Sequence, residues 1–342
     1  MPNNRILLSV IIPFYNREKT LSCAVDPVLK VKSDSIEVLL VDDGSTDGSK
    51  RLCDEYAEKD KRVKVFHKAN GGVSSARNLG IDNAQGKYVF FCDSDDCVYS
   101  EVLDNALTRL SESDCDLYIF DYVYHNLDDG KEVKQSFKIP AETELNKKAI
   151  VDNIISPLVL SSGTGLASSC HKFFLTEKIK KHNIRFEEKV FKGEDWRFVL
   201  DFTDVAETAY YIPETLYRYN LDGTQDEKKY KKIAGYHLLG SPIRKLTLCE
   251  KYNLSDSQAV EAFIYKELID GIAFSARSHC NRKELVKMKK NTYSRRALSF
   301  FKELKKKEYN NFEISRKYKL YAYSINANMF GLLSMLYRGE EK

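Results

Sequence analysis

Apolar and polar positions follow each other in blocks along the first hundred residues of the chain. Four short runs of β-branched and large apolar residues are typical of strands buried on both faces. The stretches between them have helical spacing, and Asp47 can cap the second. Pro27 should bend or end the first helix. The predicted strands are 7–12, 36–41, 63–67 and 88–92, and the predicted helices are 17–32, 47–59 and 73–84.

This alternation with short connections predicts an α/β fold whose parallel strands are joined by right-handed crossovers. In such a sheet, ligands gather at the carboxyl ends of the strands. A polar segment follows each of the four predicted strands, at 13–16, 42–45, 68–72 and 93–96. The four strands are therefore expected to end at one polar rim.

The pattern loosens after residue 100. Residues 209–219 are interpreted as two strands with a turn at Pro213. After Asn220 the chain becomes helical in pattern and rich in Lys and Tyr, so a domain boundary is expected near Asp222.

The composition indicates the class of protein and where in the cell it is expected. The chain has 342 residues, 43% hydrophobic and 30% charged, as in an ordered globular protein of two units. Without an apolar stretch of spanning length or a signal peptide, it is expected in the cytoplasm. Eight cysteines occur without a CxxC pair, which argues against a structural zinc site and favours free thiols.

Charge is unevenly distributed. Residues 281–320 hold 14 Lys and Arg against 4 Glu. The functional interpretation is contact with an anionic glycan or with the inner face of the cell membrane. The alternative is a solvated helix surface, and no nucleic-acid recognition motif is present. Residues 318–337 suit a core helix, a contact between copies of the chain, or a shallow membrane anchor.

Asp93 and Asp95 follow the fourth predicted strand with one residue between them. Neighbouring carboxylates repel unless a cation or a proton separates them. A hard ion, Mn²⁺ or Mg²⁺, completed by phosphate oxygens, suits this pair. The alternative is a turn that caps the next helix. The place of the pair at the strand end favours the metal.

Two further segments at strand ends suit a nucleotide diphosphate. Asp42 and Asp43 can accept hydrogen bonds from a uracil ring or from ribose hydroxyls, although turn chemistry alone also uses such residues. Arg77 begins a helix behind Gly71-Gly72, where a diphosphate would be attracted. Taken alone, Arg77 is more simply a solvated surface residue.

A second acidic pair, Glu194-Asp195, precedes an amphipathic stretch. Acidic residues in a first helical turn are favoured by the helix dipole. Sugar transfer also needs a base for the acceptor hydroxyl, and a carboxylate distinct from the metal ligands would supply one. The sequence leaves both interpretations open.

Together these segments resemble glycosyltransferase family 2, which has the GT-A fold. The matching segments are Ser9 to Asn16, Val41 to Asp47, Asn70 to Asn78, Asp93 to Asp96, Gly193 to Asp195 and Leu216 to Tyr219. The resemblance implies a mostly parallel Rossmann-like sheet and covers about residues 6 to 220. Within it we expect a nucleotide-sugar-binding half (1–100) and an acceptor-binding and catalytic half (101–222). The basic helical domain (223–342), expected from the pattern and charge, lies outside the resemblance.

The resemblance also implies residue roles in an inverting transfer. Asp195 would be the catalytic base with Glu194 beside it, and Asp93 and Asp95 would bind the metal. The expected nucleotide sugar is a UDP-sugar. The residues implied to bind it are Pro13, Tyr15, Asp42, Asp43, Asn70, Arg77, Asp93 and Ser94. The implied acceptor is a glycan, a polyol-phosphate polymer or a lipid-linked molecule.

The sequence departs from the family's processive members in one motif, and two other functions compete with glycosyl transfer. The family's processive synthases carry a Gln-x-x-Arg-Trp motif, and Trp196, the only Trp here, is not in one, so one sugar per encounter is expected. A nucleotidyltransferase would be expected to show a Gly-rich signature near the first strand. A glycan-binding protein that kept the fold without turnover is the second rival.

Overall fold

The computed structural model of the chain describes residues 6–112, 114–160, 165–188, 190, 193–221, 240–254, 258–278, 280–303 and 317–336. Its contacts divide the chain into two compact units. Residues 1–188 with 192–225 form the first, and residues 189–191 with 226–342 form the second. The boundary expected near Asp222 lies outside the described residues, and the three predicted domain ranges stay predictions.

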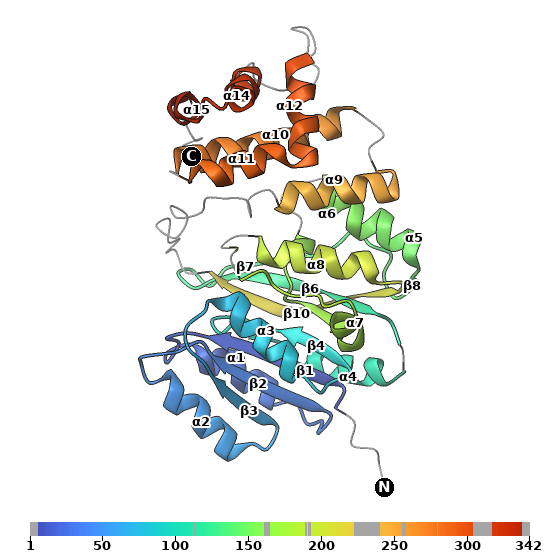
Figure 1. Ribbon diagram of the computed structural model, residues 1–342. Helices are drawn as coiled ribbons and strands as arrows, with labels where there is room; N and C mark the ends of the chain where they lie inside the picture. Colours follow the sequence, from blue (N-terminus) through green and yellow to red (C-terminus); the bar gives the residue numbers. More distant parts are fainter. Residues whose placement is uncertain are drawn as a thin grey trace. The chain divides into compact units, whose positions relative to one another are not determined.

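The first unit is built on a ten-stranded sheet (Figure 1), in the order β3-β2-β1-β4-β9-β6-β10-β5, with β7 beside β6 and β8 beside β10. The first four strands are parallel to one another, as the alternation predicted. Their bounds are Leu8–Phe14 (β1), Ile36–Asp42 (β2), Val63–His67 (β3) and Tyr88–Phe91 (β4).

The rest of the sheet mixes directions. The central β9 is antiparallel to both β4 and β6, whereas β10 is parallel to β6. The bounds are Cys97–Val98 (β5), Leu117–Asn126 (β6), Glu132–Gln135 (β7), Glu144–Leu145 (β8), Lys172–Leu175 (β9) and Ala209–Leu221 (β10).

The turn predicted at Pro213 is wrong. β10 is one strand, and its pairing with β6 shifts register between Ile212 and Thr215. Proline has no N–H for the ladder, and a bulge lets the strand pass this position without a partner.

Helices cover both faces of the sheet. Side chains of Leu8, Val10 and Ile12 share one apolar cluster with helices α1 (Leu21–Leu29) and α4 (Ser100–Glu112). Between them, Ile11 faces α3 (Val73–Asn83) on the other side, where Gly80 leaves room for it. Burial on both faces is the reason that the strand reads as a continuous apolar run.

The first two helices are shorter than predicted. Pro27 lies inside α1, which continues to Leu29, so the proline does not end the helix. In α2 (Ser49–Lys59), Gly48 occupies the N-cap position, but a carboxylate oxygen of Asp47 accepts the Ser49 N–H at 3.0 Å. The later helices of this unit are α5 (Lys147–Ile150), a π-helical turn (Val151–Ile155), α6 (Ser156–Leu160), a 3₁₀ turn (Gly165–Ala167), α7 (Thr176–Lys181) and α8 (Glu194–Val205).

All described elements of the second unit are helices, as the pattern predicted. Tyr318, Ile325 and Leu333 are buried, so the described part of 318–337 contributes to the core of this unit, while Tyr323 and Met335 are exposed. In the part of the chain that the structure describes, no helix has the length and apolar character needed to cross a membrane. The helices are α9 (Gly240–Tyr252), α10 (Gln258–Arg277), α11 (Arg282–Lys290), α12 (Thr292–Glu303), α14 (Lys317–Asn326) and α15 (Phe330–Leu336).

Candidate active site

The loops after β1 and β2 are tied together by Asn16. Its backbone has a φ of 53°, a conformation that asparagine tolerates better than most residues. The Asn16 side-chain oxygen accepts the Thr46 N–H at 2.8 Å, and the Asn16 N–H is donated to Ser45 Oγ at 3.0 Å. The polar ends of the first two strands therefore meet, as the parallel sheet predicted.

Asp43 joins the loop after β2 to the start of α3. Its buried carboxylate accepts Lys68 Nζ at 2.6 Å, the Gly71 N–H at 2.9 Å and the Gly72 N–H at 2.7 Å. In this conformation Asp43 holds protein groups with both oxygens. Asn70, in the same loop, is exposed.

Asp42 is buried one position earlier and has different partners. It accepts the Ser45 N–H at 2.8 Å and lies 2.9 Å from His67 Nδ1. Burial raises the pKa of Asp42, but the hydrogen bonds from Ser45 and His67 outweigh this effect and lower it below its ordinary value. Asp42 is therefore an ionised acceptor.

Arg77 is buried at the centre of the site, so the interpretation as a surface arginine is wrong. It donates to Asp93 Oδ1 at 2.7 Å and to Asp195 Oδ1 at 2.9 Å, and Glu194 Oε1 lies 3.8 Å away. The guanidinium lies over the Phe186 ring, 5.0 Å from its centroid. The two acidic segments that the sequence singled out thus share one arginine.

The loop after β4 is fixed by a tyrosine of β10. The Tyr217 hydroxyl accepts the Asp93 N–H at 3.0 Å and donates to the buried Asp96 at 2.7 Å. Burial and the negative charge of Asp93 raise the pKa of Asp96 to about 8. Burial is the larger of the two causes, and the Asp93 carboxylate adds to it.

Asp93 and Asp95 are more accessible than Asp96. Their side chains are 31% and 51% exposed, and Asp95 lies 3.4 Å from Arg17. Carboxylate oxygens that reach the surface are ligands that suit a hard divalent ion. Ser94, between them, is buried.

Asp195 lies in the first turn of α8 and is only partly exposed. Ser169 Oγ donates to its Oδ1 at 2.8 Å. Burial raises the pKa of Asp195 above its ordinary value, against the positive charge of Arg77. Burial, followed by the charge of Asp195, also raises the pKa of Glu194. A carboxylate with a raised pKa is a better proton acceptor.

Sequence reasoning missed a buried basic pair beside Asp195. Lys172 Nζ donates to the Ser168 carbonyl at 2.7 Å and lies 3.2 Å from His171 Nε2. Neither side chain is exposed, and burial lowers the pKa of Lys172 to about 7. The only signal was two basic residues at the start of an apolar strand, which alone does not indicate a site.

Two residues implied to line the nucleotide pocket are placed differently. Pro13 is buried within β1, paired with Val41 of β2. Tyr15, just beyond the strand, is 44% exposed. Of the two, Tyr15 presents a ring to solvent at the strand end.

The chain is similar to several known proteins. The sequence profile described as Glycosyl transferase family 2 matches residues 9–181. The chain is 28% identical to the uncharacterized glycosyltransferase EpsJ of Bacillus subtilis, over 76% of the chain and 74% of that protein. It is 29% identical to the uncharacterized glycosyltransferase YibD of Escherichia coli, over 83% of the chain and 82% of that protein.

A stronger but shorter similarity and a solved structure complete the comparison. The glycosyltransferase GlyG of Streptococcus pneumoniae is 41% identical over 36% of the chain and 42% of that protein. Residues 1–349 of S. aureus TarS, solved with UDP-GlcNAc, superpose with a TM-score of 0.57 at 20% identity, over 96% of the chain and 90% of that structure. This likeness confirms the GT-A fold, and the profile match shows that the chain belongs to glycosyl transferase family 2.

Proposed function

We propose that the protein transfers one sugar from a UDP-sugar to a hydroxyl group of an acceptor in cell-surface polysaccharide synthesis, with inversion at the anomeric carbon. The observation that carries the proposal is the buried Arg77, which links Asp93 of one candidate segment to Asp195 of the other. TarS, which shares the fold, binds UDP-GlcNAc, and this supports a nucleotide-sugar donor.

In this proposal the rim of the parallel strands binds the nucleotide sugar. Tyr15 offers a ring face, and Asp42 and Asp43 offer carboxylates for the base and the ribose. Asp43 would have to exchange its contacts with Gly71 and Gly72 for the nucleotide, so donor binding should rearrange this loop. Pro13, Asn70 and Ser94 would shape the pocket around these groups.

Asp93 and Asp95 would hold Mn²⁺ or Mg²⁺ at the donor diphosphate. The bound ion would supply Lewis-acid stabilisation of the charge on the leaving phosphate. Arg77 contributes positive charge to the same region from the protein itself.

Asp195 would accept the proton of the attacking hydroxyl. Ser169 and Arg77 orient its Oδ1, which leaves Oδ2 for the acceptor. Inversion follows when the attacking oxygen approaches from the face opposite the diphosphate. Glu194, 3.8 Å from Arg77, adjusts the charge around this base.

The acceptor is proposed to be a glycan, a polyol-phosphate polymer or a lipid-linked molecule. An anionic acceptor or membrane surface would be attracted by the basic residues of the second unit. The exposed Tyr323 and Met335 are apolar groups that could rest at such a surface or at a contact between copies of the chain.

The test is UDP release from a panel of UDP-sugars by the full chain, with water or added glycans as acceptor. We expect turnover with Mn²⁺ or Mg²⁺ and its loss in excess chelator. Asp195→Asn should bind the donor normally and lose turnover by about 10²-fold or more, as for removal of a general base. Asp128→Asn, in an exposed turn, is the matched control.

Two results would contradict the proposal. Full turnover in excess chelator would show that the reaction does not need a metal ion. An unchanged kcat of Asp195→Asn would show that Asp195 is not the base. A donor that stabilises the fold without any turnover would support the rival glycan-binding function instead.

A further inference from the structure

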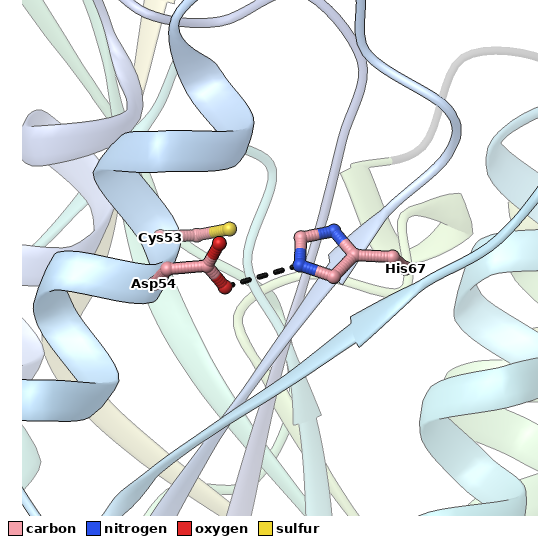
Figure 2. Close-up of side chains that lie close together, drawn as sticks. All are labelled: Cys53, Asp54 and His67. Carbon is pink, nitrogen blue, oxygen red and sulfur yellow. Dashed lines mark hydrogen bonds and ion pairs between the residues drawn. The ribbon is translucent and has the colours of Figure 1, made fainter.

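Three potential metal ligands from two elements meet at one edge of the first unit. Cys53 and Asp54 are neighbours on α2, and His67 ends β3 (Figure 2). The Cys53 Sγ, an Asp54 carboxylate oxygen and a His67 ring nitrogen all lie within 4.8 Å of one another. Nothing in the proposed transfer reaction uses these three side chains.

Hydrogen bonding determines which His67 nitrogen is available. Nδ1 lies 2.9 Å from Asp42 Oδ2, and Asp42 is an ionised acceptor, so Nδ1 must carry the proton that it donates. In the neutral ring, Nε2 then has a bare lone pair. Zinc-binding histidines commonly have this arrangement, with the second ring nitrogen donating to a carboxylate.

In that neutral form, Nε2 faces another acceptor. Asp54 Oδ1 lies 3.1 Å from it, and Figure 2 shows the two groups directed at each other. Two lone pairs at this distance repel unless a positive species lies between them. A proton on Nε2 would remove the repulsion, and so would a metal ion bound by both atoms.

Cys53 favours the metal. A proton shared by Asp54 and His67 would need no third group, whereas a tetrahedral ion needs more donors, and the Cys53 sulfur is within reach. Sulfur, imidazole nitrogen and carboxylate oxygen together suit Zn²⁺ better than Mg²⁺ or Mn²⁺. A mixed set of this kind is chemically distinct from the oxygen ligands of Asp93 and Asp95.

Accessibility suits an ion that enters from solvent. Cys53 is fully buried, but the side chains of His67 and Asp54 are 32% and 49% exposed. Water can therefore occupy the fourth position.

We propose that Cys53, Asp54 and His67 bind one Zn²⁺ ion with water as the fourth ligand, and that Asp42 orients the histidine through its contact with Nδ1. Binding releases the thiol proton of Cys53 to solvent as the sulfur–zinc bond forms. The absence of a CxxC pair argued against zinc only for ligands close together in sequence, and these ligands come from two elements.

Co²⁺ is the probe, because cobalt bound to a thiolate has a near-ultraviolet charge-transfer band that oxygen ligands do not produce. Metal-free full-length protein is titrated with Co²⁺ and then with Zn²⁺. We expect a sulfur–cobalt band that saturates at one equivalent and disappears when Zn²⁺ displaces the cobalt. Because Asp93 and Asp95 supply only oxygen, cobalt bound there does not contribute to this band.

Variants assign the band to these residues. Cys53→Ser and His67→Gln should remove it, and Cys23→Ser, which alters an exposed cysteine, should retain it. His67→Gln replaces a partly exposed side chain, so it remains informative if Cys53→Ser fails to fold. No sulfur band in the wild type, or an unchanged band in His67→Gln, would overturn the proposal. The spectrum does not depend on turnover, so failure of the proposed transferase activity leaves this test intact.

Discussion

Replacing Lys172 by methionine tests how strongly burial acts on this amine. Its pKa falls from 10.5 to about 7 in the folded protein, because the charged form loses its hydration. The unfolded chain keeps its proton up to about pH 10.4. Between these values the unfolded state binds more protons, so the contribution of Lys172 to the free energy of unfolding rises with pH.

The magnitude follows from the two pKa values. One pKa unit corresponds to about 1.4 kcal/mol. Between about pH 7 and pH 9.5 the difference in bound protons integrates to a gain of about 3 kcal/mol for the wild type relative to Lys172→Met. Urea unfolding of both proteins across this range measures that difference directly.

Controls separate this effect from lost packing. Lys172→Met also removes the hydrogen bond to the Ser168 carbonyl, but that loss shifts the curve by a constant amount. Lys131→Met, at an exposed position, should follow the wild-type pH dependence. If the free energy of unfolding of Lys172→Met has the same pH dependence as that of the wild type, the desolvation of this amine that the structure indicates is refuted.

Other variants test the site's geometry. Gly44→Ala should destabilise the fold by about 1–3 kcal/mol, because Gly44 has a φ of 81° and an added Cβ would lie 2.9 Å from Asn70 N. Gly130→Ala is the control, because Gly130 has a φ of 68° but an added Cβ would meet no atom within 4 Å. In urea unfolding this variant should lose less stability than Gly44→Ala. Equal losses would show that the contact with Asn70 N is unimportant. Arg77→Met should lower the free energy of unfolding by about 3 kcal/mol. This is the lower end of the range for a broken buried ion pair, because the carboxylate partners of Arg77 are partly exposed. A smaller loss than that of an exposed ion pair would refute the role of Arg77 in holding the two acidic segments. If Asp195 is the base, Lys172→Met should shift the acidic limb of the kcat/KM pH profile to higher pH, because the charge of Lys172 lowers the pKa of Asp195. An unmoved limb would show that Lys172 does not influence the catalytic base.

The first half of the sheet was predictable because its signal is local. β1 and β2 are buried on both faces, so their sequences are continuous apolar runs. Short crossovers then place the polar segments that follow these strands at one edge. The convergence of Asp43 and Asp93 on one rim required no knowledge of distant contacts.

The features that sequence did not reveal depend on distant partners. Arg77 looked like a surface residue because Asp195, which helps neutralise it, lies 118 positions away. The continuity of β10 through Pro213 depends on pairing with β6, since propensity alone favours a turn there. Lys172 is recognisable only after folding, because its pKa depends on burial and not on its neighbours in sequence.

The hydroxyl of Tyr217 also sets an order of events during synthesis. Asp93 and Asp96 leave the ribosome well before Tyr217, which lies 124 and 121 positions later in the chain. Contacts between such distant residues form slowly, because a long loop must close before they can be made. The Asp93 N–H and the Asp96 carboxylate therefore obtain this partner only after β10 has been synthesised. A chain that stops before residue 209 lacks this partner, which links the production of active protein to completion of the first unit.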